Sequence, residues 1–255
     1  MDKPYVVDET DNYAVVFKPA KMHSESMHSE SLAKEFAQSH KGAKGSEGVA
    51  TIYDWYLEIL GYKEDVRLMH RLDFETNGLV LFAKNEKSFN FFKELQDSGE
   101  FIKEYSAICV PAESNMADDG FPDNNFVPSC LREKKFAIES YFRPYGPGRK
   151  QVRPVVDIPK KHKEIAKDKG GFYKTEIIDV KDSEEKKVFT VQIKRGFRHQ
   201  IRCHLCWAGF PILNDPLYSH IEAQPSGLLA LRSHALFFAD PVSGEKRECS
   251  ITPLQ

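Results

Sequence analysis

The chain has 255 residues, 41% of them hydrophobic, so it can bury a substantial core as one large domain or two small ones. A formal charge of -2 and a sequence pI of about 6.5 exclude a globally basic nucleic-acid binder, so an RNA partner would need a local positive surface. No apolar run reaches about 18 residues, which excludes a membrane-spanning helix and predicts no membrane partner.

The N-terminus and the cysteines indicate the compartment. The opening residues, MDKPYVVDETDNY, are acidic and polar, unlike a signal peptide. Five cysteines form an odd, unpatterned set, which is typical of a reducing environment rather than of a disulfide framework. We therefore expect a cytoplasmic protein.

The first fifty residues predict one strand and several polar segments. Residues 13–17, YAVVF, predict a strand that ends at Lys18-Pro19, because proline removes a donor from the ladder. Residues 23–31, HSESMHSES, predict a surface loop. A short helix over 31–36 and a glycine-rich linker over 41–48 are expected to follow.

Two helices and two strands are expected between residues 51 and 110. Thr51 is a suitable N-cap for a helix that ends near Gly61, with apolar residues at helical spacing between them. An apolar run over 79–83 predicts a buried strand, and residues 86–98 predict a second helix. Residues 101–110, FIKEYSAICV, alternate as in a strand.

Two charged segments of opposite sign follow. Residues 112–125 predict an acidic loop. Residues 143–163 contain seven lysines and arginines against one aspartate, and their glycines and prolines make a helix improbable and predict irregular structure. This basic strip is either a phosphate-contacting surface or a solvated insertion loop.

The last third predicts an antiparallel pair of strands, a helix and two more strands. Residues 174–180 and 187–194 form the pair, and residues 199–208 are expected to be helical up to Gly209. The segment 227–240 predicts a strand followed by a PVSG turn and a final strand into residue 251.

The chemistry is concentrated in residues 69–85, MHRLDFETNGLVLFAKN. Here His70, Arg71, Asp73, Glu75 and Thr76 crowd into a loop directly before the buried strand. Loops held by a scaffold in this way often display reactive side chains. A plain polar turn before a strand explains this segment equally well when it is taken alone.

A second segment, residues 195–218 (RGFRHQIRCHLCWAGFPILNDPLY), decides between these interpretations. Together the two segments resemble the RluA-type pseudouridine synthases, whose patterns are HRLDxxTSG and GRxHQIRxHLxxxGxPIxGDxxY. The first segment matches in HRLD, T and G, and the second in HQIR, HL, G, PI, D and Y. Weaker similarity runs from about residue 13 to 238 and includes Lys18-Pro19-Ala20 and the KxYxA pattern at 103–107.

The resemblance implies a fold and an activity. The expected fold is α+β, a single catalytic domain over 1–255 with its core at about 13–240. Its mixed, mainly antiparallel sheet carries flanking helices and a central cleft. No separate N-terminal RNA-binding module is expected. The expected activity is isomerisation of uridines in ribosomal or transfer RNA to pseudouridine after base flipping. No cofactor or metal is expected because the reaction has no redox step, and a monomer is expected.

The resemblance also implies residue roles. Asp73 corresponds to the catalytic aspartate, Arg202 to the arginine that pairs with it, and Tyr105 to the tyrosine that covers the base. Leu231 is expected in the wall of the pocket, and Arg71 to take the place of the flipped base. The remaining substrate-side residues are His70, Thr76, Arg198, His199 and Gln200, of which the two histidines are expected to make structural hydrogen bonds. Arg202→Met is expected to fold normally and to lose turnover.

Four positions depart from the family pattern. Asn77 replaces a serine, and Phe197 stands where an arginine or lysine is usual, which removes a possible phosphate contact. Asn214 and Ser219 replace glycines, and asparagine tolerates the left-handed backbone better than most residues.

Three other readings compete with the enzyme. A non-catalytic RNA-binding or assembly protein on the same fold is the main alternative. A metal site at Cys203-His204-Leu205-Cys206 lacks the second pair of ligands that zinc sites normally have. A hydrolase that uses Asp73 and Glu75 as a pair of carboxylates is the least favoured alternative.

Overall fold

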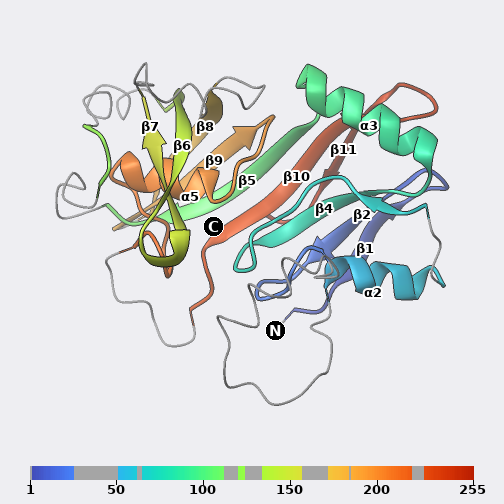
Figure 1. Cartoon of the computed structure of the whole chain (residues 1–255), viewed down its shortest axis with the longest axis horizontal. Coiled ribbons are helices and arrows are strands. Elements are labelled where there is room, and N and C mark those ends of the chain that lie inside the picture. Colours follow the sequence, from blue (N-terminus) through green and yellow to red (C-terminus); the bar gives the residue numbers. More distant parts are fainter. Residues whose placement is uncertain are drawn as a thin grey trace, which may run out of the picture. The chain divides into compact units, whose positions relative to one another are not determined.

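The computed structural model describes residues 2–25, 51–61, 65–111, 120–123, 134–156, 172–183, 185–219 and 227–255. The chain divides into two compact units, Met1–Lys93 and Glu94–Gln255, and the division falls within helix α3 (Glu86–Ser98). Figure 1 shows the elements of both units in sequence colours. The expected helix at 31–36 and linker at 41–48 lie outside the described residues, as do most of the 23–31 and 112–125 loops.

The first unit is built on an antiparallel sheet in the order β1-β2-β4. Its strands are β1 (Tyr5–Glu9), β2 (Tyr13–Lys18) and β4 (Asn77–Ala83), and the short β3 (Arg67–Leu68) pairs with β4. Every residue of β2 and β4 is buried, which explains their nearly continuous apolar sequences. β1 and β3 were not predicted, because β1 is acidic and β3 has only two residues.

Helix α2 (Ile52–Ile59) confirms the expected cap at Thr51. The Thr51 hydroxyl accepts a hydrogen bond from the Asp54 N–H at 3.0 Å, which satisfies one of the unpaired donors of the first turn. The ring of Tyr56 packs on Phe82 of β4 with centroids 4.6 Å apart. Gly61 has a φ of +68°, a conformation that glycine adopts without strain, just after the helix ends.

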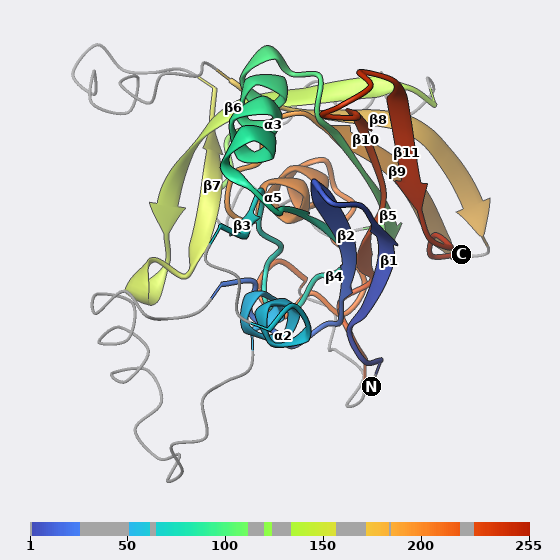
Figure 2. The same ribbon diagram turned by 90° about the vertical axis from the view of Figure 1, so that its right-hand side faces the viewer.

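The second unit contains an antiparallel sheet in the order β11-β10-β5-β9-β8-β6-β7. Its elements are β5 (Ile102–Cys109), β6 (Phe136–Tyr145), β7 (Gln151–Val155), β8 (Tyr173–Ser183), β9 (Lys186–Ile193), α5 (Gln200–Trp207), β10 (Leu231–Ala239) and β11 (Lys246–Ser250). All eight residues of α5 are buried, and Figure 2 shows strands of this unit curving around that helix. The α+β class and the mainly antiparallel sheet are therefore confirmed.

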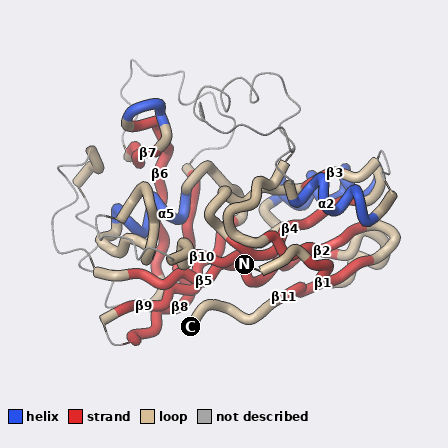
Figure 3. Tube along the Cα trace, turned by 90° about the horizontal axis from the view of Figure 1, so that it is seen from below, coloured by secondary structure: helices blue, strands red, loops and turns tan. Residues whose placement is uncertain are grey.

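The expectation of irregular structure after residue 143 is wrong for residues 143–155. These residues belong to a hairpin in which β6 pairs with β7 and Arg143 lies opposite Arg153. A 3-10 turn at Pro147–Arg149 forms its tip (Figure 3). Pro154 is tolerated because β7 ends the strand order, so the missing N–H need not serve a second neighbour.

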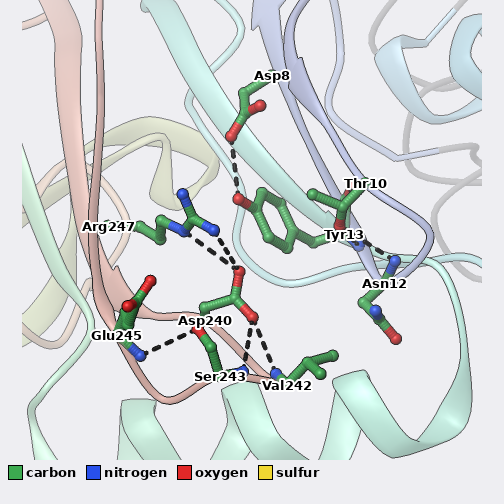
Figure 4. Close-up of polar contacts among 9 residues, drawn as sticks. All are labelled: Asp8, Thr10, Asn12, Tyr13, Asp240, Val242, Ser243, Glu245 and Arg247. Atoms are coloured by element: carbon green, nitrogen blue, oxygen red, sulfur yellow. Dashed lines mark hydrogen bonds and ion pairs between the residues drawn. The ribbon is translucent and has the colours of Figure 1, made fainter.

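The expected PVSG turn is present between β10 and β11 (Figure 4). The Asp240 carboxylate accepts hydrogen bonds from the backbone N–H groups of Val242 and Ser243 and from the Arg247 guanidinium. The two N–H donors and the guanidinium stabilise the ionised form, which lowers the pKa of Asp240. Figure 4 also shows the Tyr13 hydroxyl of the first unit donating to Asp8.

Within the part of the chain that the structure describes, no helix has the length and apolar character needed to cross a membrane.

Candidate active site

The loop that carries Asp73 is fastened to the chain on both sides of that residue. On one side, the Ser24 hydroxyl donates to the Leu72 carbonyl at 2.9 Å and accepts from the Leu72 N–H at 3.0 Å. On the other side, the Lys21 N–H donates to the Phe74 carbonyl at 2.7 Å. Asp73 itself is half-buried, and its carbonyl accepts from the Thr76 N–H. The backbone around this carboxylate is therefore held in one conformation.

A buried lysine accompanies this loop. Lys18, the last residue of β2, is 0% exposed, and its ammonium donates to the carbonyls of Pro19 and Met22 at 2.9 and 2.8 Å. Burial lowers the pKa of Lys18 to about 7, while the negative charges of Asp73 and Glu75 oppose that shift. The sequence analysis used Lys18 as the end of a strand and as part of the family-like Lys18-Pro19-Ala20 segment, and gave it no place in the site. The available signal was a lysine directly after five apolar strand residues.

The other polar residues of the first motif differ in their surroundings. The His70 Nε2 atom accepts from the Leu81 N–H at 3.3 Å, the structural hydrogen bond that was expected. Thr76 is buried, and its hydroxyl has no hydrogen-bond partner among the described residues. The Arg71 side chain is 67% exposed and lies 3.3 Å from Glu25.

Arg202 of α5 forms a buried, two-pronged ion pair with Asp215. Its Nε and Nη2 atoms donate to the two carboxylate oxygens at 2.8 Å, and Arg202 is only 2% exposed. Asp215 also accepts from the N–H groups of Leu217 and Tyr218. Such fork-shaped pairs fix the plane of a guanidinium. Sequence reasoning missed this partner, although the aspartate is part of the second motif.

This ion pair bears on the expectation that Arg202→Met folds normally and loses turnover. Arg202→Met cannot be treated as a neutral replacement, because it would leave the Asp215 carboxylate buried without its cation. Removing one partner of a buried ion pair costs about 3–5 kcal/mol.

Tyr105 and Leu231 lie on the same face of the second unit's sheet. Tyr105 of β5 is opposite Ser233 of β10, and Leu231 is opposite Ala107, so strand alternation directs all four to one side.

The same face carries α5. Tyr105 is also opposite Val191, which is opposite Ile177. Thr175 lies two residues before Ile177 on β8, so its side chain points to the same face. It hydrogen-bonds to Gln200 of α5 at 3.1 Å. The helix that carries Arg202 thus packs on the face to which Tyr105 and Leu231 point.

The residues at the start of α5 serve the architecture. Gln200 accepts from the Phe197 N–H and donates to Lys174 and Thr175, so its amide is fully engaged in holding the helix. His199 has a left-handed φ of 57°, and its Nδ1 lies 3.2 Å from the Tyr218 hydroxyl, again the structural hydrogen bond that was expected.

The Arg198 guanidinium, by contrast, reaches the hairpin. It donates to the backbone carbonyls of Arg149 and Gln151, at the tip and at the start of β7.

The side chains of Cys203, His204 and Cys206 make hydrogen bonds within the protein. The His204 ring nitrogens lie 2.7 and 2.9 Å from the hydroxyls of Thr175 and Ser140. Complete burial lowers the pKa of His204 to about 3. Cys203 and Cys206 donate to backbone carbonyls. Among the described residues, no group of three or more histidine, cysteine or acidic side chains is placed to hold a metal.

The basic strip is partly a surface and partly core. Arg143, Arg149 and Lys150 are exposed around the hairpin tip. Arg153 is instead 0% exposed and lies 4.2 and 4.1 Å from the rings of Phe121 and Tyr145. The prediction that Arg153 contributes to a phosphate-contacting surface is therefore wrong, because stacking against two rings holds its guanidinium inside the fold. The strip beyond residue 156 lies outside the described residues.

The backbone of Asn214 agrees with the expectation that asparagine can replace the family's glycine at this position. Its φ is 59°, the left-handed conformation expected where the family has glycine. The turn before Asp215 is thus kept.

Comparison with solved structures defines the fold class as that of a pseudouridylate synthase. Human RNA pseudouridylate synthase domain containing 4 superposes with a TM-score of 0.61 at 17% identity, over 98% of this chain and 88% of that one. Human RNA pseudouridylate synthase domain containing 1 gives the same TM-score at 16% identity, over 98% of this chain and 83% of that one.

The family follows from sequence. Residues 12–207 match the model of the RNA pseudouridylate synthase family, and the chain belongs to that family. Ribosomal large subunit pseudouridine synthase C of Rickettsia typhi is 25% identical over 95% of this chain and 65% of its own length. An RNA pseudouridine synthase of Helicobacter pylori is 25% identical over 77% of this chain and 55% of its own length. The chain thus spans less than two thirds of either relative.

Proposed function

We propose that this protein is an RNA pseudouridine synthase that isomerises specific uridines in ribosomal or transfer RNA. The observation that carries the proposal is the presence of Asp73, Tyr105 and Arg202 together at the family's motif positions. The Rickettsia typhi relative, named ribosomal large subunit pseudouridine synthase C, supports an RNA substrate of this kind. The family match over 12–207 runs across the boundary between the two units, which supports treating them as one catalytic domain.

In the proposed mechanism, the target uridine leaves the RNA stack, because a base inside a stack cannot turn. Arg71, whose side chain is exposed on the Asp73 loop, takes the place of the flipped base. The Asp73 carboxylate then acts as nucleophile or general base during cleavage of the N1–C1′ bond. The uracil rotates and is rejoined through C5, with Tyr105 and Leu231 as walls that hold the free base.

Arg202 is proposed to keep Asp73 ionised where water is excluded, because a nearby opposite charge favours the charged form of a carboxylate. Asp215 binds Nε and Nη2, so a bond to a second carboxylate would be made through Nη1. The proposed isomerisation has no redox step and needs no electron sink, and its roles are assigned to protein side chains, so the proposal includes neither an organic cofactor nor a metal. We place this enzyme in the cytoplasm as a monomer.

The test is pseudouridine mapping of RNA from a strain that lacks the protein, complemented with wild type or with Asp73→Asn. A site that disappears and returns only with the wild type would support the enzyme and identify its RNA. Equal restoration by Asp73→Asn would remove Asp73 from the mechanism. If no site is lost, the result would favour the alternative of a non-catalytic RNA-binding protein on this fold.

Arg202 needs a test that respects its ion pair with Asp215. The double variant Arg202→Met/Asp215→Asn removes both charges and avoids a buried lone carboxylate. The matched control is Asp215→Asn alone. Loss of turnover in the double variant beyond that of the control, with both folded, is the expected result. Equal turnover would contradict the proposed role of Arg202.

A further inference from the structure

An exposed aromatic ring follows the proposed catalytic aspartate directly. Phe74 is 39% exposed, and its ring packs on the imidazole of His23 with centroids 4.6 Å apart and planes tilted by 38°. His23 therefore supports the phenyl ring, which keeps a substantial part of its surface exposed.

The backbone under this ring is held in place. The Phe74 carbonyl accepts from Lys21, and the preceding Leu72 is bonded through both backbone groups to Ser24. A ring with only two side-chain torsions on a fixed backbone loses little conformational entropy when a ligand packs on it. This is the form of a prearranged stacking surface.

Two residues close to Phe74 along the backbone carry exposed cationic side chains. Lys21 is exposed and is bonded to Phe74 through the backbone, while the Arg71 side chain is 67% exposed three residues earlier. Glu25 balances part of this charge through its contact with Arg71. A flat apolar surface near exposed cations suits a nucleotide, since a base can stack on the ring while its phosphate meets the cations.

A single exposed phenylalanine is ordinarily unremarkable, because more than half of a folded protein's surface is apolar. Phe74 differs from such residues because of its position in the chain, directly after Asp73. Consecutive Cα atoms lie about 3.8 Å apart, so this exposed ring is attached directly beside the proposed catalytic residue. This step rests on the proposed function.

We propose that Phe74, supported by His23, is a stacking site for an unpaired nucleobase next to the target uridine in the RNA substrate. Every base presents a flat π-face, so this site contributes affinity with little dependence on base identity. Lys21 and Arg71 contribute by meeting the adjoining phosphates.

The test compares Phe74→Leu and Phe74→Trp with a matched control, Tyr5→Leu. Tyr5 is also an exposed aromatic residue of the first unit, 47% exposed and stacked on Phe17 at 4.9 Å, but it lies on β1. Two probes are used: fluorescein-labelled single-stranded oligouridylate for binding, and total RNA from cells lacking the protein for pseudouridine formation. Thermal unfolding of each variant checks that the fold is retained.

Phe74→Leu is expected to weaken oligouridylate binding by about 5- to 150-fold, the range measured for loss of one base–aromatic stack. It should raise the half-saturating RNA concentration more than it lowers kcat. Phe74→Trp should bind as well as wild type, and so should Tyr5→Leu. Equal binding by Phe74→Leu and Tyr5→Leu would overturn the proposal, as would a Phe74→Trp defect equal to that of Phe74→Leu.

The two probes separate this inference from the proposed function. A wild type that binds oligouridylate but forms no pseudouridine would count against the enzyme, while the binding comparison would still decide on Phe74. An active wild type with unchanged Phe74→Leu binding would overturn the stacking site alone.

Discussion

Lys18 provides the sharpest physical prediction, because an almost fully buried ammonium makes stability depend on pH. Its pKa falls from 10.5 to about 7 in the folded protein, chiefly because burial disfavours the charged form. Between these two values the unfolded chain binds the proton and the folded chain does not. The free energy of unfolding therefore rises with pH across this window.

The magnitude follows from the same linkage. One proton difference changes the free energy of unfolding by about 1.4 kcal/mol per pH unit, but at pH 7 about half of the folded molecules still carry the proton on Lys18. Lys18 therefore contributes a rise of about 2 kcal/mol between pH 7 and 9. Below about pH 7, Lys18 is charged in both the folded and the unfolded chain, and the full free-energy cost of its buried charge lowers the stability of the fold. Lys103, whose pKa burial lowers to about 8, adds a similar rise only above that pH. A comparison with Lys18→Met isolates the Lys18 contribution, because Lys103 is unchanged.

Lys18→Met keeps the length of the side chain and removes the charge. It also removes the hydrogen bonds to Pro19 and Met22, each worth about 1.5–3 kcal/mol for a charged donor, so stability at one pH does not decide the matter. The measurement is urea unfolding of both proteins at pH 7, 8 and 9. Wild type should gain about 2 kcal/mol more than Lys18→Met over this range. Parallel pH profiles would refute the reasoning.

Three further outcomes are expected. Asp215→Asn should cost about 3–5 kcal/mol in urea unfolding, because the Arg202 guanidinium stays buried without its carboxylate; a loss below about 1 kcal/mol would contradict this. The pKa of His204 falls to about 3, so between pH 6.5 and 3 the unfolded state binds more protons and stability falls on acidification. Between pH 6.5 and 4.5, wild type should lose about 2 kcal/mol more than His204→Gln, and equal losses would remove His204 as the cause. Lys150→Gln at the exposed hairpin tip should weaken RNA binding and reduce its salt slope by about one, and an unchanged slope would exclude a phosphate contact there.

Much of the local structure was predictable because it depends on neighbours in the chain. The Thr51 cap and the 86–98 helix follow from short-range patterns, and both are present at the expected positions. The left-handed Asn214 could likewise be anticipated from the backbone preference of asparagine. The hairpin over 143–155 could not, since its prolines argue against a strand unless the edge position of β7 is known.

The candidate site divides in the same way. Asp73, Tyr105 and Arg202 stand out in the sequence because each lies in a motif, and their residue types suit the chemistry. The partners of these groups did not stand out: Asp215 is 13 residues from Arg202, and the Lys18 ammonium reaches carbonyls that gain meaning only once the chain turns after β2. Arg153 shows the same limit, since its charge suggested a surface, whereas Phe121 and Tyr145 enclose it. Sequence determines which groups are available, while burial and pairing depend on contacts between distant segments and are decided only by the tertiary structure.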